Sequence, residues 1–487
     1  MKKNDRLRNL INSLTRGEQD FIQKSFALLS TKRAGEFQDL FGKLASDDRH
    51  KKPGEQNNVS VRYALRNHIL RYMQLYRKPS KEDQILDNMR NYHFLRKKGL
   101  YDQAIRALDK AIALAKELEE VSWQIILLQV EKHRVLESER RELSDKIVSK
   151  NQQQVKLAQQ WLEEVNAQMQ YHLAFAGYRE QGNWDKQYFQ QGTQITLSEN
   201  SSFYAKTYFW SLKAAEARAE NNYAEAASYC KRILHLWRGN KTLMGEFPGK
   251  MIVFNANYGM AALGTRAFEE VEQAIENLED LPHTYFDWEA ERFQNIALLK
   301  ILLALEQAPD SSVTDLIDFT VNGLQHYHVK INPARELTLW YNLLLLTFIY
   351  ERFDESQAWI NKIIAHKRFN IRKEIQYVTR LIEPIVQYEA GNLVGLDSLL
   401  NAVYMFFYSN EKLGEFEKAV LRHLRKLTDL QSQDESSVLF RKFKMHLERD
   451  LPFSETRRLG FSLCHVWATS KVRNVPIQTL LPLNYIE

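Results

Sequence analysis

The run Gly99-Leu-Tyr101-Asp-Gln-Ala104 is the first copy of a short pattern that recurs along the chain. It contains a small or polar residue, any residue, an aromatic anchor, two polar residues and a small residue, then apolar residues four and seven positions later. Such a run predicts a helix that ends at a residue tolerant of a left-handed conformation, an anchor that fills the gap, and a second, antiparallel helix. Further copies begin at Asn221, Arg266, Glu351 and Gly391, and a weaker one centres on Gly182-Asn-Trp184.

The anchors recur with a regular period. They stand at 101, 184, 223, 268, 353 and 393, which gives a spacing near 42 residues once the two long intervals are halved. The missing copies are expected near residues 142 and 310. Gly and Pro are scarce, with 18 and 10 in 487 residues, so long helices with few hairpins of strands are expected. The sequence therefore predicts an all-α repeat protein.

The helix before each anchor carries a second signature. Trp340-Tyr-Asn342-Leu343 precedes Phe353, and Asn257-Tyr258-Gly259 precedes Phe268 at the equivalent distance. With these motifs, residues 85–408 resemble the tetratricopeptide repeat (TPR) superfamily. The resemblance implies a right-handed α-solenoid of antiparallel helix pairs. The period exceeds the 34 residues typical of TPR units, so the longer HEAT and armadillo repeats remain the competing assignment.

Four parts follow from this pattern: a basic N-terminal helical bundle (1–79), a TPR-like α-solenoid (80–409), C-terminal capping helices (410–472) and a non-helical tail (473–487). The N-terminal part also resembles the leader of uncharacterised bacterial TPR-containing proteins. In it, Thr15 and Glu18 form a predicted capping box, and residues 37–44 carry an apolar stripe. The tail is expected to dock back through Leu480, Leu481 and Tyr485.

Positive charge is concentrated at the N-terminus. Residues 1–80 contain 17 Lys and Arg against 8 Asp and Glu, a local +9, so the remaining residues sum to −3 within a total of +6. A basic block can contact phosphates. The candidate nucleic-acid-binding residues are Lys51, Lys52, Arg62 and Arg66, although no helix-turn-helix signature accompanies them.

Several other classes lack support in the sequence. There is no signal peptide and no uncharged apolar run of membrane-spanning length, and the two cysteines, Cys230 and Cys464, have no partners in sequence. We therefore expect a cytoplasmic protein without a membrane segment. No phosphate loop, dinucleotide fingerprint, zinc motif or nucleophile elbow is present, so no enzymatic activity, metal or small-molecule cofactor is expected. His326-Tyr-His328 is interpreted as a helix end, and Cys464-His465 as a core thiol beside a surface imidazole.

The expected function is that of a non-catalytic scaffold that binds a peptide or protein on the concave face of the solenoid. The TPR resemblance implies that a first-helix asparagine can bond a peptide backbone, which makes Asn257 and Asn342 candidates. An internal capping role is the open alternative for both. Tyr208 and Arg218 are further candidates. Tyr208 belongs to the aromatic cluster Phe203–Trp210, for which inter-helix packing is the other interpretation. A nucleic-acid-associated or ligand-sensing regulatory protein that uses the basic block is the alternative function.

Overall fold

The chain is all-helical in the computed structural model wherever it is described. These ranges are residues 6–45, 59–76, 79–138, 143–181, 196–282, 286–307, 312–366, 371–428 and 433–481. The all-α prediction is thus confirmed for this part of the chain. Two compact units, Met1–Leu157 and Ala158–Glu487, meet within one long helix, α8 (Leu143–Gln181). Each unit has a hydrophobic core of its own.

The first unit begins with four helices around a small core. The predicted capping box is confirmed, because the Thr15 hydroxyl accepts the Glu18 amide at 3.3 Å while the Glu18 carboxylate accepts the Thr15 amide at 2.7 Å. The core is built from Ile11, Ile22 and Phe26, the predicted stripe in residues 37–44, and Leu65 and Ile69 of the fourth helix. These elements are α1 (Arg6–Asn12), α2 (Arg16–Ser25), η1 (Phe26–Leu28), α3 (Thr31–Ala45) and α4 (Val59–Tyr76).

A helical hairpin, a third helix and the first part of α8 complete this unit. A second capping box, between Ser80 and Asp83, begins the hairpin, and Ala104, Leu108 and Ala111 form its buried seam. Small side chains in that seam let the two helices approach closely. The helices are α5 (Lys81–Lys97), α6 (Tyr101–Glu117) and α7 (Val121–Ser138).

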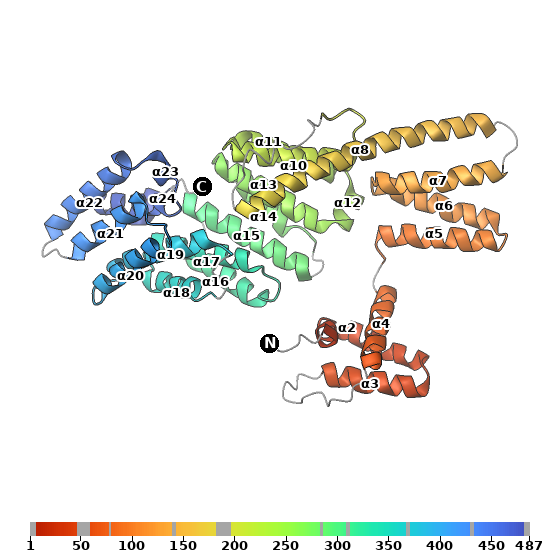
Figure 1. Ribbon diagram of the computed structural model, residues 1–487, viewed down its shortest axis with the longest axis horizontal. Coiled ribbons are helices and arrows are strands. Elements are labelled where there is room, and N and C mark those ends of the chain that lie inside the picture. The colour runs from red at the N-terminus through yellow and green to blue at the C-terminus, as the bar shows by residue number, and fades with distance from the viewer. Residues whose placement is uncertain are drawn as a thin grey trace. The chain divides into compact units, whose positions relative to one another are not determined.

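The second unit is a series of helical hairpins (Figure 1). Within each hairpin the two helices pack together, and helices α13, α15, α17, α19 and α21 also contact one another in succession. We call these five helices the contiguous layer. The elements up to the last repeat are α10 (Phe203–Ala219), α11 (Tyr223–Arg238), α12 (Lys241–Glu246), α13 (Pro248–Gly264), α14 (Phe268–Glu279), α15 (Phe286–Glu306), α16 (Val313–His326), α17 (Pro333–Ile349), α18 (Phe353–Ile364), α19 (Lys373–Glu389) and α20 (Leu396–Ser409).

A left-handed residue stands in each of the five strong pattern copies. Gly99, Asn221, Arg266, Glu351 and Gly391 all have φ between 57° and 74°. The amide that follows each of them donates to the carbonyl five residues earlier, at 2.8 Å from Arg352 to Thr347 and at 3.0 Å from Ala267 to Ala262. This is the Schellman arrangement that satisfies the last carbonyls of a helix. The prediction of an αL-tolerant residue at the first position is therefore confirmed.

The apolar positions behave as predicted, whereas the anchors do so only in part. Every small residue of the pattern and every residue four and seven positions later is buried in the five strong copies. Among the anchors, Tyr223, Phe268 and Phe353 are partly buried. Tyr223 is covered by the next pair, since a Cβ on Gly264 would lie 2.3 Å from its ring.

The prediction that each anchor fills the gap between its helices is wrong for two anchors. Tyr101 begins α6 but is 64% exposed, and Leu393 is 54% exposed. In the last copy the helix begins at Leu396, three residues later than the pattern predicts, because Gly395 adds a second left-handed residue at φ 82°. The anchor there lies outside the helix and cannot fill the gap.

The remaining calls concern turns and the C-terminus. The expected turns near 142 and 310 fall on residues 139–142 and 308–311, which lie outside the described ranges. The weak copy at Gly182 also lies outside them. The C-terminal elements are α21 (Glu415–Thr428), α22 (Gln433–Arg449), α23 (Phe453–Thr456), α24 (Phe461–Arg473) and η2 (Ile477–Leu480). Leu480 and Leu481 do pack against the main core, and Ile477–Leu480, within the predicted tail, form a short 3₁₀ helix. Tyr485 is not among the described residues.

Candidate interaction surfaces

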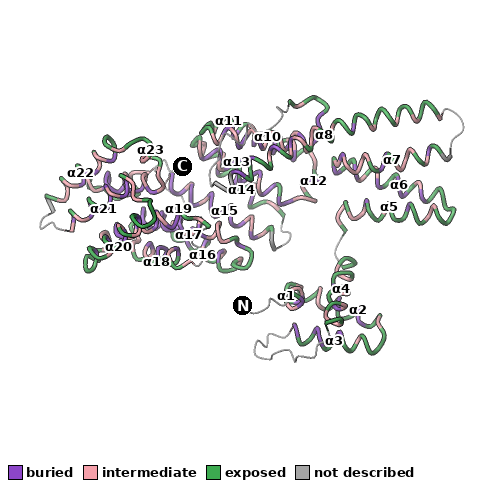
Figure 2. The backbone as a smooth tube through the Cα atoms, in the orientation of Figure 1, coloured by how far each residue is buried: buried purple, intermediate pink, exposed green. Residues whose placement is uncertain are grey.

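The contiguous layer is closed along the second half of α17. Every residue of α17 from Tyr341 to Ile349 is buried (Figure 2). A stretch of helix buried on all sides has no face left for a ligand. In α19, nine residues between Ile375 and Val386 are buried, whereas Tyr377, Arg380, Glu383 and Gln387 keep partial exposure along one side. The second half of α17 is therefore core rather than groove.

The C-terminal segment 460–481 covers α19. At one end of α19, a Cβ on Gly460 would lie 2.5 Å from Cγ2 of Val378. At the other end, the buried carboxylate of Glu389 accepts a hydrogen bond from the Trp467 indole at 2.7 Å and pairs with Lys471. Farther along the segment, the Ile477 amide donates to the Glu351 carboxylate at 3.3 Å. The chain thus occupies this surface with its own C-terminus.

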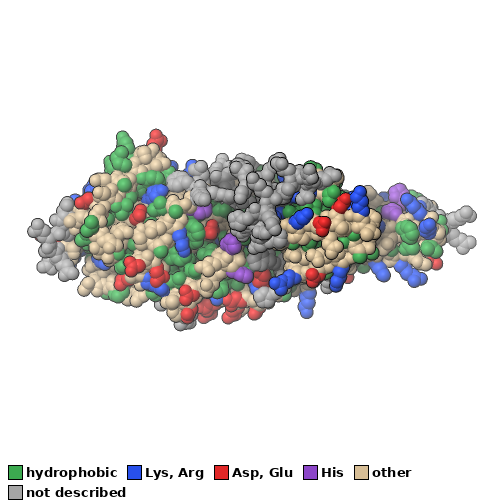
Figure 3. All heavy atoms as spheres, turned by 90° about the horizontal axis from the view of Figure 1, so that it is seen from below, with side chains coloured by type: hydrophobic (Ala, Val, Ile, Leu, Met, Phe, Trp, Pro, Cys, Tyr) green, Lys and Arg blue, Asp and Glu red, His purple; other side chains and the backbone are tan. Residues whose placement is uncertain are grey.

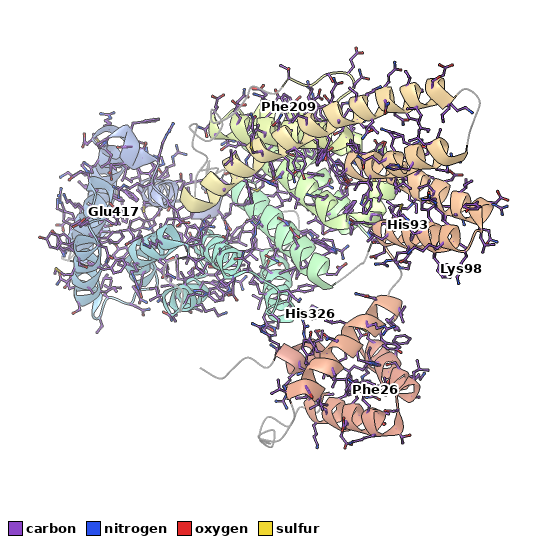
Figure 4. All side chains as sticks on the ribbon, turned by 45° about the vertical axis from the view of Figure 1, so that its right-hand side comes forward. Phe26, His93, Lys98, Phe209, His326 and Glu417 are labelled. Carbon is purple, nitrogen blue, oxygen red and sulfur yellow. The ribbon has the colours of Figure 1, made fainter. Side chains whose placement is uncertain are left out.

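A second cluster fastens residues 455–458, just before this segment, to α21. The carboxylate of Glu417, which is buried, accepts the Gly414 amide at 2.9 Å and both contacts of Arg458 Nη1 at 2.8 Å. The same guanidinium reaches Glu455, and Glu455 in turn accepts the Phe416 amide. A carboxylate with this many donors is satisfied although it is buried. Figure 4 marks Glu417 on α21.

Asn342 lies inside the closed part of the layer. Its side chain is 4% exposed, and its amide nitrogen donates to the Thr338 carbonyl at 2.8 Å. Its side-chain oxygen has no hydrogen-bond partner. This arrangement matches the internal alternative and leaves no path for a peptide backbone.

Asn257, by contrast, lies on the one open stripe of α13. All other faces of this helix are buried, and the residues that keep solvent exposure follow one another at helical spacing. Asn257 is exposed, and Val253 and Met260 on either side of it are partly exposed. The exposed Lys250 begins the same row, and we call Lys250, Val253, Asn257, Met260 and Gly264 the open stripe.

The other two protein-binding candidates lie on α10. Tyr208 is partly buried, its hydroxyl accepts the Gln168 amide at 3.3 Å, and its ring lies 5.9 Å from that of Tyr171. These contacts join α10 to the second half of α8. Arg218 is partly buried near Cys230. Neither candidate shares the open stripe with Asn257, because α11 packs between α10 and α13.

The aromatic cluster at the start of α10 is mainly packing. Phe203 is 8% exposed, and its ring lies 5.2 Å from that of Trp237, which is fully buried. Trp237 also contacts Phe254 on α13, again at 5.2 Å, and its indole donates to Thr207 at 3.1 Å. These residues hold three helices together. Phe209, marked in Figure 4, is only partly buried.

Only two of the four basic candidates lie among the described residues. Lys51 and Lys52 lie outside the described residues. On α4, Arg66 is exposed and Arg62 is partly buried. The basic block has a shallow depression of about 360 Å³, lined by Ser30, Lys32, Arg33, Glu36, Phe37, Ser60, Val61 and Ala64. Another depression, of about 420 Å³, lies elsewhere in the chain.

Both cysteine thiols are buried. Among the described residues, no three His, Cys, Asp or Glu side chains gather in a way that could hold a metal ion. Burial raises the pKa of the Cys230 thiol to about 12 and raises that of Cys464 further. His465 faces away from Cys464 and bonds to Glu448 at 2.9 Å, which agrees with the core-and-surface interpretation. His328 Nδ1 lies 2.9 Å from the Gln325 carbonyl, as expected at a helix end.

Comparisons with known proteins place the chain in no family. No family model, no curated protein and no solved structure matches it. Across the described helices, none combines the length and the apolar content needed to cross a membrane.

Proposed function

We propose that this chain is a non-catalytic scaffold, a TPR-like right-handed α-solenoid that binds an extended peptide or a segment of another protein. The repeated hairpins with Schellman turns support the architecture. Solenoids expose long surfaces and usually serve in binding. We place the binding surface on α13 rather than along the whole layer.

The observation that carries the proposal is the open stripe. An exposed amide between a valine and a methionine offers one donor group and one acceptor to a peptide backbone. The flanking apolar side chains can contact the side chains of that peptide, and methionine adapts to several shapes. An extended segment that crosses α13 is the ligand that this chemistry fits.

The test uses a thiol placed on the stripe. Both native cysteines are buried, so Asn257→Cys adds the reactive thiol on which a cleavable cross-linker can be mounted. The matched control is Asn361→Cys, at an exposed position on α18 whose side-chain oxygen accepts a hydrogen bond from Gln357. Both full-length proteins are incubated with extract of the native cell, and the adducts are identified by mass spectrometry.

Asn257→Cys is expected to capture a protein that Asn361→Cys does not. Competition with protein that carries no cross-linker tests the site. Native protein should compete for the partner and reduce the amount of adduct at least about tenfold. The Asn257→Arg protein, whose open stripe is blocked, should compete less. The same adducts at both positions, or equal competition by Asn257→Arg, would refute the proposed surface.

Nucleic-acid binding by the basic block is the second candidate. It rests on the local charge of +9 and on Lys32 and Arg33 beside a depression. On the face drawn in Figure 3, however, Lys and Arg are interspersed with acidic and uncharged side chains. Binding of RNA or DNA whose affinity falls steeply with salt, and that disappears in an Arg62→Glu/Arg66→Glu protein, would favour this function. Weak binding without salt dependence would exclude it.

A further inference from the structure

The second-unit half of α8 carries an apolar stripe that faces solvent. The stripe repeats at intervals of four, three, four, three and four residues, the spacing of a coiled-coil seam. Three of its large side chains are well exposed, Leu162 at 62%, Met169 at 46% and Val165 at 41%. We call the following set the α8 stripe, all of whose members are exposed: Ala158, Leu162, Val165, Met169, His172 and Ala176.

The opposite side of this helix is already used. Ala167 and Ala174 are buried there, and Gln170 is 9% exposed. Glu163 and Glu164 reach the start of α10, where their carboxylates accept the hydroxyls of Ser201 and Ser202, each at 2.7 Å. The packing of α8 on its own unit is therefore satisfied without the α8 stripe.

Charge is missing from the exposed side. Between residues 158 and 177 the charged side chains are Glu163 and Glu164 alone, and both are held on the packed side. The positions that flank the stripe carry Gln159, Trp161, Asn166, Gln168 and Leu173. In a chain with 26% charged residues, an exposed helix face without charge has the composition of an interface core, where charged residues are depleted.

The uncharged composition of this face limits the kind of partner that it can bind. The face has no lysine or arginine, so it lacks what nucleic acid and anionic membrane surfaces require. An acidic or basic peptide would find no countercharge. A second copy of this helix meets every requirement, because it brings the same uncharged seam, with large side chains in the middle and alanine at both ends, and no like-charge repulsion.

The available area is sufficient for a specific contact. Besides the three large stripe residues, Trp161 is 47% exposed and Leu173 is 39% exposed. Covering these side chains and their neighbours on two helices removes on the order of 1,200 to 1,600 Å² from solvent, the size of a standard specific interface. We propose that the α8 stripe is the interface between two copies of this chain.

The test measures the association of the full-length chain. Sedimentation equilibrium over a wide concentration range is expected to give the mass of two chains for the native protein. Leu162→Glu places carboxylates in a seam without countercharge, which should weaken association at least about 100-fold. The matched control is Met405→Glu, at a methionine on α20 that is 57% exposed and should change association less than about threefold.

Both substitutions replace exposed side chains, so circular dichroism should show unchanged folding. As an independent readout, Val165→Cys is expected to give a cross-linked dimer with a short bismaleimide, and Met405→Cys is not, because the native thiols are buried. A monomer at every concentration, a dimer unaffected by Leu162→Glu, or no cross-linked dimer from Val165→Cys would each overturn the proposal. Peptide binding at the open stripe is a separate property, and its failure would leave these results unchanged.

Discussion

His423 should make the C-terminal part of this chain sensitive to mild acid. Its ring is 6% exposed and lies among aromatic rings, with centroid distances of 4.2 Å to Phe443 and 4.8 Å to Phe440. Its Nε2 atom has no hydrogen-bond partner. Burial, with a smaller contribution from the positive charge of Lys426, lowers the pKa of His423 to about 3. The imidazole is therefore neutral in the folded protein at any moderate pH.

The size of the effect follows from proton linkage. The unfolded chain protonates this residue near pH 6.5, whereas the folded chain does so only near pH 3. Between these values the unfolded state binds more protons, so stability falls as the pH falls. Each unit below 6.5 lowers the free energy of unfolding by about 1.4 kcal/mol. At pH 5 the loss from His423 is about 2 kcal/mol, and above pH 6.5 it vanishes.

Hydrogen exchange can measure this loss locally, since a chain with two compact units need not unfold in one step. Amide protection in α21, α22 and α24 is compared at pH 7 and pH 5, after correction for intrinsic exchange, in the native and His423→Leu proteins. The leucine variant should lose about 2 kcal/mol less than the native protein. The control, His328→Leu at an exposed histidine, should keep the native pH dependence. An equal loss in the native and His423→Leu proteins would refute the linkage argument.

Substitutions at four further positions test the packing and the backbone conformation. Trp467→Ala should cost about 3–5 kcal/mol because it leaves a cavity and removes a donor from Glu389, seen as loss of exchange protection in α24. Gly323→Ala should destabilise its hairpin by about 1–3 kcal/mol, because a Cβ there would lie 2.0 Å from the Phe293 ring. Gly42→Ala, with nothing within 4 Å, should instead stabilise α3 by about 0.5–1 kcal/mol in urea unfolding. Glu411→Gly, at φ 55°, should stabilise by up to about 1 kcal/mol, and Glu411→Ala should not.

The hairpins could be predicted because their signals are local. A left-handed residue such as Asn221 or Arg266, a small residue and two apolar positions occur within about a dozen residues. Each of these features acts through bonds and contacts inside its own hairpin. The late start of α20 was missed because Gly395, one more turn residue, shifts the helix without removing the pattern.

The C-terminal segment 460–481, which we call the covering segment, carries no such local signal in the sequence. In α24 the run from Val466 to Ser470 is buried on every side, so its polar and apolar residues do not alternate with a helical period. A periodic pattern reports one buried face, and this helix has several. Its main polar contact, with Glu389, spans 78 residues in sequence, a distance over which no pattern of one chain can indicate pairing.

The same limit explains why two equivalent asparagines differ. Asn257 and Asn342 occupy the same place relative to their anchors, yet one is exposed and the other is 4% exposed. Local sequence sets the position of a residue on its helix, while distant packing decides whether solvent reaches it. The amide itself is consistent with both environments, since in the buried case its nitrogen bonds within the helix to Thr338.

The covering segment also determines where a partner can bind. A ligand on the end of α19 that Trp467 covers would first have to displace this residue, whose side chain is fully buried. Exposing 150–250 Å² of indole costs about 4–6 kcal/mol at about 25 cal/mol per Å². That penalty alone weakens binding roughly 10³- to 10⁴-fold, before the loss of the Lys471–Glu389 pair is counted. No such displacement is needed on α13, where Asn257 already faces solvent. For ligands that make equal contacts, the open stripe is therefore the favoured site by several orders of magnitude.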